Sequence, residues 1–331
     1  MRVGVVGLGY WGPNLARNFH ALPDCELAWC CDADPGRRGR IAEQFRATRV
    51  TDDIADLLTD PQLDAIVLAT PVPTHGPLAV AALEAGKHCF VEKPLAQSVA
   101  DAERAVAAAA DSERVLMVGH LLEYHPGVRA LKEIVDSGQL GELRYIYGNR
   151  LNLGQLRADE NALWSLGAHD VSVVLALAGE EPNQLTARGE CYMREGVEDV
   201  VFGFLRFPSG LMAHLHLSWL DPHKERRFTV VGAKRMATFD DMELERKVTI
   251  YDKGFDESAA YGEYVARAGE IRSPLVPNTE PLRLECAHFV ECVREGRTPQ
   301  SDGESGLRVV RILEGLQREL DETRRVVALV P

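Results

Sequence analysis

The chain has 331 residues, which is enough for two domains that each bury a core. Its formal net charge of -13 argues against nucleic acid or an anionic membrane surface as a partner. The seven cysteines form no C-x-x-C pair, the N-terminus shows no signal segment, and no run of about eighteen apolar residues occurs. We therefore expect reduced thiols and a cytoplasmic protein without membrane contact.

The chain opens with a buried strand that runs through a glycine-rich turn into a helix. Val3–Val6 is apolar and largely β-branched, and the turn that follows has the spacing G-x-G-x-x-G. The first glycine permits a tight turn, the second lets the backbone approach a pyrophosphate, and the third lets the helix pack closely. Helix N–H groups would then face the phosphates. This predicts a dinucleotide site whose loop residues are Gly7, Gly9, Tyr10, Trp11 and Gly12.

A second strand, in "CELAWCCDADP", ends at Asp32, twenty residues beyond Gly12. A carboxylate at this place hydrogen-bonds the ribose hydroxyls of NAD and repels the 2′-phosphate of NADP. We therefore expect NAD. Arg37 and Arg38 leave NADP as the alternative, because nearby arginines neutralise a 2′-phosphate; otherwise they lie on a solvated helix start.

Residues 1–120 continue this alternation of strand and helix. The predicted strands are Val3–Val6, Leu27–Cys31, Ala65–Ala69, His88–Val91 and Val115–Val118, with helices at about 14–21, 36–46, 53–59, 76–86 and 98–111. The pattern predicts an α/β domain with a doubly wound parallel sheet, a Rossmann fold, whose ligands lie beyond the carboxyl ends of the strands.

Residues 121–331 change to an α+β pattern, which predicts a second domain with a large, mostly antiparallel, open-faced sheet. Two hairpins are expected, with turns at 208–210 and 232–234. The stretch 254–280 has weak periodicity and reads as an irregular arm, followed by helices at about 281–295 and 303–320. His214 and His216 share one strand face, but no third or fourth ligand accompanies them, so we expect no metal.

The stretch "ATPVPTHGPLAVAALEAGKHCFVEKPLA" places Glu92-Lys93-Pro94 at the end of a strand, about twenty residues after Thr70-Pro71 and His75. In this order it resembles the glucose-fructose oxidoreductase / inositol dehydrogenase (Gfo/Idh/MocA) family, and the resemblance covers essentially the whole chain. It implies cofactor contacts at Thr70, Pro71, His75, Glu92 and Lys93. "GYWGPNLARNF", "RLNLG", "ALWSLGAHD" and "SWLDP" are similar to the branch that acts on nucleotide sugars.

Lys93 and His169 are the predicted catalytic residues. A lysine at a strand's carboxyl end faces the ligand crevice, and partial burial lowers its pKa toward working pH; the alternative is a lysine that only pairs with Glu92 or a backbone carbonyl. His169 lies in the first turn of an apolar helix at 168–178, where the helix dipole favours the neutral imidazole. It matches the histidine of the family pattern D-x-G-x-H, in which Ser165 replaces the aspartate.

Arg150 and Asn152 end a strand that leads toward the crevice, and arginine suits a carboxylate or phosphate; the alternative for Arg150 is an ion pair on the sheet. His120 at the domain junction either lines the site or belongs to a hinge. The full set of predicted substrate-binding residues is Lys93, His120, Arg150, Asn152, Trp164, Ser165 and His169.

These residues predict an NAD-dependent sugar oxidoreductase that moves a hydride between nicotinamide and a ring carbon, C3, of a nucleotide-linked hexose such as UDP-N-acetylglucosaminuronic acid. Within enzymes, the alternatives are a keto-deoxysugar nucleotide 3-ketoreductase and an inositol or free-sugar dehydrogenase. A non-catalytic regulator that senses dinucleotide is the alternative from another class, and the presence of Lys93 and His169 argues against it. We expect a homodimer or homotetramer that associates through one face of the sheet.

Overall fold

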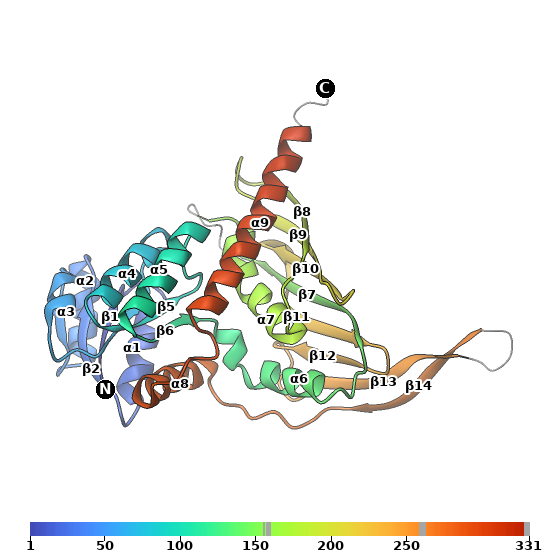
Figure 1. Cartoon of the computed structure of the whole chain (residues 1–331), viewed down its shortest axis with the longest axis horizontal. Coiled ribbons are helices and arrows are strands. Elements are labelled where there is room, and N and C mark those ends of the chain that lie inside the picture. The colour runs from blue at the N-terminus through green and yellow to red at the C-terminus, as the bar shows by residue number, and fades with distance from the viewer. Residues whose placement is uncertain (155, 157–159, 258–262, 328–331) are drawn as a thin grey trace. The chain divides into compact units, whose positions relative to one another are not determined.

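The computed structural model describes residues 1–154, 156, 160–257 and 263–327, with side chains described through Arg324. The chain divides into two compact units (Figure 1). The first combines Met1–Tyr124 with Thr279–Arg311, and the second combines His125–Asn278 with Ile312–Pro331. Among the described residues, no helix is both long and apolar enough to cross a membrane.

The first unit contains a six-stranded parallel sheet in the order β3-β2-β1-β4-β5-β6. This order confirms the predicted doubly wound Rossmann sheet. Its strands are β1 Arg2–Val6, β2 Glu26–Cys31, β3 Arg49–Thr51, β4 Ala65–Leu68, β5 His88–Glu92 and β6 Leu116–Gly119. Its helices are α1 Gly12–Ala21, α2 Pro35–Gln44, α3 Ala55–Thr59, α4 His75–Glu84 and α5 Val99–Ser112, with short turns η1 Val72–Thr74 and η2 Leu121–Tyr124.

The sequence analysis missed β3, because this three-residue strand is exposed and lacks the apolar run that marks its neighbours. The predicted division at residue 120 also differs from the compact units, since Thr279–Arg311 returns to the first one. Helix α8, Pro281–Glu295, packs its apolar face on α1 and β5, beside α1 in Figure 1. Phe289 stands edge-on to Phe19 and Phe90, with ring centroids 6.2 and 5.7 Å apart.

The second unit contains an eight-stranded sheet in the order β14-β13-β12-β11-β7-β10-β9-β8. Only the β7–β10 pair among these described strands is parallel, which confirms a mostly antiparallel sheet. The strands are β7 Leu143–Leu153, β8 Gln184–Glu190, β9 Val200–Arg206, β10 Met212–Ser218, β11 Leu220–Gly232, β12 Met236–Asp240, β13 Val248–Glu257 and β14 Tyr264–Arg272. Both predicted hairpins are present, and Gly210 takes the left-handed φ of +90° that its turn needs.

Helices cover one face of this sheet. Leu215 and Leu217 on β10 are fully buried on that face, where Gly203 of β9 approaches Leu316. The helices of this unit are α6 Pro126–Asp136, a π-helical turn η3 Leu163–Gly167, α7 Ala168–Ala178 and the part of α9, Gly303–Val327, that begins at Ile312. The opposite face, which carries His214 and His216, is partly exposed.

The prediction of an irregular arm at 254–280 was wrong, since β13 and β14 form an antiparallel ribbon there. The residues of β14 are mostly exposed on both sides, so they lack the alternation of apolar and polar residues by which a half-buried strand is recognised. The predicted helices at about 281–295 and 303–320 are present as α8 and α9, and α9 extends to Val327.

Candidate active site

The glycine-rich loop between β1 and α1 has the geometry of a phosphate cradle. Gly7 has a φ of +91°, and a Cβ there would lie 2.5 Å from the carbonyl oxygen of Ala69. At Gly12 a Cβ would lie 1.9 Å from the carbonyl oxygen of Gly7, so α1 packs directly on the loop. A Cβ on Gly9 would meet nothing closer than Arg37 Nη1 at 3.9 Å, which leaves open space over the loop. The residues present therefore fit a dinucleotide pyrophosphate at the start of α1.

Asp32, just after β2, is held toward this loop by backbone donors. The N–H of Leu8 donates to its Oδ2 at 2.6 Å, and the N–H of Asp34 donates to Oδ1 at 2.8 Å. Arg37 Nη1 lies 3.4 Å from Oδ2, whereas Arg38 donates to the carbonyl oxygens of Asp32 and Ala33. The carboxylate is thus held in one orientation with Arg37 as its cationic neighbour, and its contact with ribose hydroxyls stays a prediction.

The ends of β4 and β5 are joined through His75, which is almost fully buried. Its ring nitrogens lie 2.8 Å from the carbonyl oxygens of Thr70 and Pro94. Thr74 donates its hydroxyl to the Pro71 carbonyl oxygen at 2.7 Å, which closes the turn after β4. His75 therefore fixes the two segments predicted to contact the cofactor, and a direct contact of its own stays a prediction.

Lys93 follows the last residue of β5, at the carboxyl end of the parallel sheet, and its peptide bond to Pro94 is cis. The backbone N–H of Lys93 donates to Glu92 Oε2 at 3.3 Å. Burial raises the pKa of Glu92 to about 7, and the positive charge of Lys93 opposes that rise. Lys93 thus lies beside a carboxyl group that titrates near neutral pH.

His120 follows β6, the strand next to β5, and is fully buried. Burial, and then the positive charge of Lys93, lowers its pKa to about 3, so its imidazole is neutral. Neither ring nitrogen has a hydrogen-bond partner among the described residues. A buried, unsatisfied imidazole has hydrogen-bonding capacity for a ligand, in keeping with the predicted substrate contact.

In the second unit, His169 lies in the first turn of α7, as predicted. The chain enters this helix through η3, a π-helical turn that contains Trp164 and Ser165 and that the sequence analysis did not foresee. Such turns are frequent at functional sites. Asn161 orders the entry, because its Oδ1 accepts from the N–H of Trp164 at 3.1 Å and its carbonyl oxygen from the N–H of Ser165 at 3.0 Å.

Arg150 on β7 forms a buried ion pair with Asp170 on α7. Its Nε and Nη2 lie 2.7 and 2.6 Å from Asp170 Oδ1. Burial raises the pKa of Asp170, and the guanidinium of Arg150 opposes that rise. Arg150 thus holds the residue next to His169, and its predicted contact with substrate stays a prediction. Asn152, two residues along β7, has a buried Oδ1 without a partner among the described residues.

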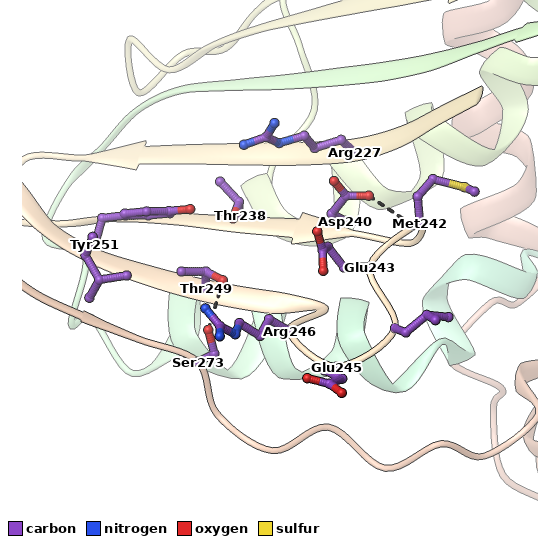
Figure 2. Close-up of a pocket in the computed structure, with 12 residues that line it drawn as sticks. Arg227, Thr238, Asp240, Met242, Glu243, Glu245, Arg246, Thr249, Tyr251 and Ser273 are labelled. Atoms are coloured by element: carbon purple, nitrogen blue, oxygen red, sulfur yellow. Dashed lines mark hydrogen bonds between the residues drawn. The ribbon is translucent and has the colours of Figure 1, made fainter. Parts of the chain in front are cut away.

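The second unit also contains a hollow that none of the predicted site residues line. It measures about 1110 Å³ and lies over β11, β12, β13 and β14, beside the 241–247 loop, as Figure 2 shows. Its lining includes Arg227, Thr238 and Tyr251 on the strands and Glu245 and Arg246 on the loop. No group of three or more His, Cys, Asp or Glu side chains suited to a metal ion occurs in the part of the chain that the structure describes.

Comparison with known proteins identifies relatives over nearly the whole chain. The chain is 26% identical to myo-inositol 2-dehydrogenase of Thermotoga maritima, with 98% of each chain covered. It resembles the structure of UDP-N-acetylglucosamine 3-dehydrogenase GnnA from Acidithiobacillus ferrooxidans with a TM-score of 0.83, 25% identity, and 97% and 98% of the two chains covered. GenD2 from gentamicin A biosynthesis, solved in complex with NAD, matches with a TM-score of 0.82, 26% identity, and 98% and 95% coverage.

Two family models match separate parts of the chain. Residues 1–120 match the oxidoreductase family with an NAD-binding Rossmann fold, and residues 128–238 match the GFO/IDH/MocA C-terminal domain. The first match covers the glycine loop, Asp32 and Glu92-Lys93-Pro94, and the second covers Arg150 and His169. The chain therefore belongs to the Gfo/Idh/MocA family of NAD-dependent oxidoreductases.

Proposed function

We propose that the protein is an NAD-dependent sugar dehydrogenase that oxidises a ring hydroxyl, at C3, of a nucleotide-linked hexose such as UDP-N-acetylglucosaminuronic acid. The observation that carries the proposal is the position of Lys93, at the carboxyl end of β5 in the unit that contains the glycine cradle and Asp32. The likeness to a UDP-N-acetylglucosamine 3-dehydrogenase over nearly the whole chain supports this substrate class.

The residues that would hold NAD are the open loop at Gly9, the start of α1 and Asp32, with Thr70 and Pro71 after β4. When bound, NAD supplies the hydride acceptor. Helix α1 begins without a side-chain cap on its N-terminal N–H groups, which suits a phosphate at that end. Asp32 would bind the adenosine ribose through the lone pairs that its backbone donors leave free.

The proton of the oxidised hydroxyl is assigned to Lys93, which acts as the base in its neutral amine form. His169 orients the hydroxyl as a neutral imidazole, because Ser165 supplies no carboxylate to stabilise an imidazolium. His120 and Asn152 carry buried polar atoms that have no partner among the described residues, so both have hydrogen-bonding capacity for a substrate. Arg150 supports α7 through Asp170.

A second candidate substrate is a free cyclic polyol, and the similarity to myo-inositol 2-dehydrogenase favours it. The two are separated by mixing the protein with NAD and a panel of UDP-linked hexoses, inositols and free sugars while nicotinamide absorbance is followed. Reduction of NAD with a UDP-linked hexose is expected. Turnover of inositols alone would select the second candidate, turnover only of keto sugars with NADH would identify a reductase, and NAD binding without turnover of any substrate would indicate a regulator.

Variants at three positions test the assigned roles. Lys93→Ala is expected to lower kcat about a hundredfold or more, the range for a lost general acid or base. His169→Ala should be intermediate, and Ser165→Ala should stay within about tenfold, because a neutral hydrogen bond contributes roughly 1 kcal/mol. Lys132→Ala, which alters a partly exposed lysine of α6 that pairs with Asp136, is the matched control.

All these variants should still bind NAD, since none alters the glycine loop, and titration by fluorescence checks this. If Ser165→Ala proved as damaging as Lys93→Ala while NAD binding survived, the serine would be part of the proton relay and Lys93 would not be its sole carrier.

A further inference from the structure

Two adjacent acidic residues of the second unit, Glu198 and Asp199, lie just before β9, and each is only 1% exposed. A buried carboxylate is stable only where charged groups or N–H donors surround it. Each of these residues therefore marks a place at which neighbouring parts of the chain are held together. The proposed chemistry uses neither of them.

Glu198 links the start of η3 to α9. Its Oε1 forms an ion pair with the guanidinium of Arg324 near the end of α9, and its Oε2 accepts from Nδ2 of Asn161 at 2.6 Å. Its backbone carbonyl oxygen accepts the N–H of Ala162 at 2.9 Å. Because Asn161 and Ala162 directly precede η3, Glu198 holds the beginning of the π-helical turn through both its backbone and its side chain.

The amide of Asn161 has a single orientation that satisfies this network. Its Nδ2 donates to Glu198 and also to Oε1 of Gln317 on α9, at 2.8 Å. On the other side, its Oδ1 accepts the N–H of Trp164. If the amide were turned over, its oxygen would face the carboxylate of Glu198 and its nitrogen would face the N–H of Trp164. The hydrogen bonds therefore fix where η3 begins.

Helix α9 carries the partners of Glu198 and Asn161 on a packed surface. The part of α9 in this unit lies over β8 and β9, as Figure 1 shows, and a Cβ on Gly189 of β8 would lie 3.0 Å from Leu320. Gln317 and Arg324 lie about one turn of the helix on either side of Leu320. The network thus rests on a helix that is packed on the sheet.

Asp199 connects the same place to the end of β7. Its carbonyl oxygen accepts the N–H of Trp219 at 3.0 Å, and the carbonyl oxygen of Trp219 accepts the N–H of Gly154, which follows β7, at 2.9 Å. A Cβ on Gly154 would lie 2.9 Å from Oδ1 of Asn152, so the backbone passes close to that side chain. The end of β7 and the start of η3 are therefore both anchored at residues 198–199.

We propose that Glu198 and Asn161 are positioning residues of the substrate site. Acting through η3, they set the place of Trp164 and of His169, since η3 runs directly into the first turn of α7. A misplacement of about 1 Å is enough to lower the rate of a reaction about a hundredfold. The relevance of this arrangement to turnover rests on the proposed function, whereas the arrangement itself is measured without a substrate.

An exchange of donor and acceptor tests the pairing. Asn161→Asp keeps an acceptor for the N–H of Trp164 but replaces the donor to Glu198 by an oxygen, so two carboxylates face each other. Adding Glu198→Gln restores the pair, because its amide nitrogen donates to the new carboxylate while its amide oxygen still accepts from Arg324. The double variant Asn161→Asp/Glu198→Gln thus reverses the direction of one hydrogen bond and keeps the shape of the network.

The first measurement is hydrogen exchange of the full-length, cofactor-free protein, read by mass spectrometry on peptides that contain residues 161–169. Asn161→Asp should speed the exchange of residues 162–165 about tenfold or more, since the network that holds their N–H groups is broken. The double variant should return to within about threefold of the wild type. Asn183→Asp, which adds the same charge at an exposed residue of the second unit, is the matched control and should change nothing in these peptides.

An Asn161→Asp protein that exchanges like the wild type, or a double variant that exchanges as fast as Asn161→Asp, would overturn the proposal. If Asn161→Asp alone does not fold, Glu198→Gln alone takes its place, because one amide cannot accept from both Asn161 and Arg324. Its exchange at residues 162–165 should exceed that of the wild type and should fall again in the double variant. No difference between these two proteins would contradict the pairing.

The second measurement compares sugar oxidation with NAD binding. Asn161→Asp should lower kcat/KM for the sugar about tenfold or more and leave the Kd for NAD unchanged, and the double variant should recover most of the loss. Faster exchange of residues 162–165 with an unchanged kcat/KM would show that the pair holds the turn without positioning the site, and would overturn that role. If the wild type oxidises no sugar, only the proposed function fails, and the exchange data still decide whether Asn161 and Glu198 hold the turn.

Discussion

We propose that Asp32 selects the cofactor, because two backbone N–H groups fix the orientation of its carboxylate. In this proposal the carboxylate binds the ribose hydroxyls, and Arg37, 3.4 Å from Asp32 Oδ2, weakens its repulsion of a 2′-phosphate. Wild-type protein should bind NAD(H) at least about tenfold more tightly than NADP(H), or about 1.4 kcal/mol. Asp32→Ala should narrow that difference, as titration of both cofactors would measure.

Asp52→Ala is a suitable control for this prediction, because Asp52 pairs with Arg38 at 3.3 Å but is largely exposed. It should leave the preference almost unchanged. Tighter binding of NADP(H) by the wild type would mean that the two arginines dominate over Asp32.

Single residues were predictable where their role depends on neighbours in the sequence. The three glycines predict the phosphate-binding loop, because a strand, a tight turn and a helix that follow one another directly require glycines at this spacing. The burial of Glu285 was not predictable, because α8 packs on α1 and β5, which lie far away in the chain. The same holds for Arg150, whose partner Asp170 is brought to it by the packing of α7 on β7.

At the scale of elements, the Arg150–Asp170 ion pair connects β7 to the first turn of α7, where Asp170 directly follows His169. Asp170→Ala would leave the guanidinium buried without its partner, and breaking such a pair costs about 3–5 kcal/mol. We expect the free energy of unfolding of the second unit to fall by this amount, as urea denaturation would measure.

The double variant Arg150→Met/Asp170→Leu should recover much of that stability, because apolar side chains of similar size remove both buried charges. A double variant as unstable as Asp170→Ala would show that the shape of the pair, rather than an uncompensated charge, accounts for the loss.

Whole elements were predictable when their burial leaves a pattern in the sequence. The five apolar strands of the first unit form continuous apolar runs that are buried on both faces, and β9 and β10 alternate in burial along the strand. Strand β14 and the π-helical turn η3 show no such pattern, because β14 is exposed on both sides and η3 differs from an α-helical turn only in its hydrogen bonding.

At the scale of the whole molecule, the partly exposed face of the eight-stranded sheet, which carries His214 and His216, suggests that the chain forms an oligomer. Phe202 stacks on His216 and Phe204 on His214, with ring centroids 4.4 and 5.7 Å apart, and Tyr147 stacks on the other side of His214. Phe202 and Phe204 remain about 40% exposed. Because contiguous exposed apolar surface of this kind marks association sites, we propose that a second copy of the chain covers it.

Light scattering at micromolar concentration should therefore show a dimer or tetramer. Phe204→Asp should dissociate it by placing a charge in the interface, whereas Leu275→Asp, at an exposed apolar residue outside the strands, should not. Burial lowers the pKa of both His214 and His216, so their neutral forms suit a covered face and acid should weaken the assembly as they become charged. A wild-type monomer at neutral pH would contradict the prediction.

The return of α8 to the first unit has a consequence for how the protein is made. The ribosome synthesises β1 to β6 long before it synthesises Phe289. Phe19 and Phe90, which Phe289 covers in the folded protein, therefore stay exposed while the entire second sheet is synthesised. Such a nascent chain exposes this apolar surface for longer than a contiguous Rossmann domain would, and it is more prone to aggregate during that time. A premature stop after residue 278 would therefore damage the cofactor-binding unit although every residue of its glycine loop, its Asp32 and its Lys93 had already been translated.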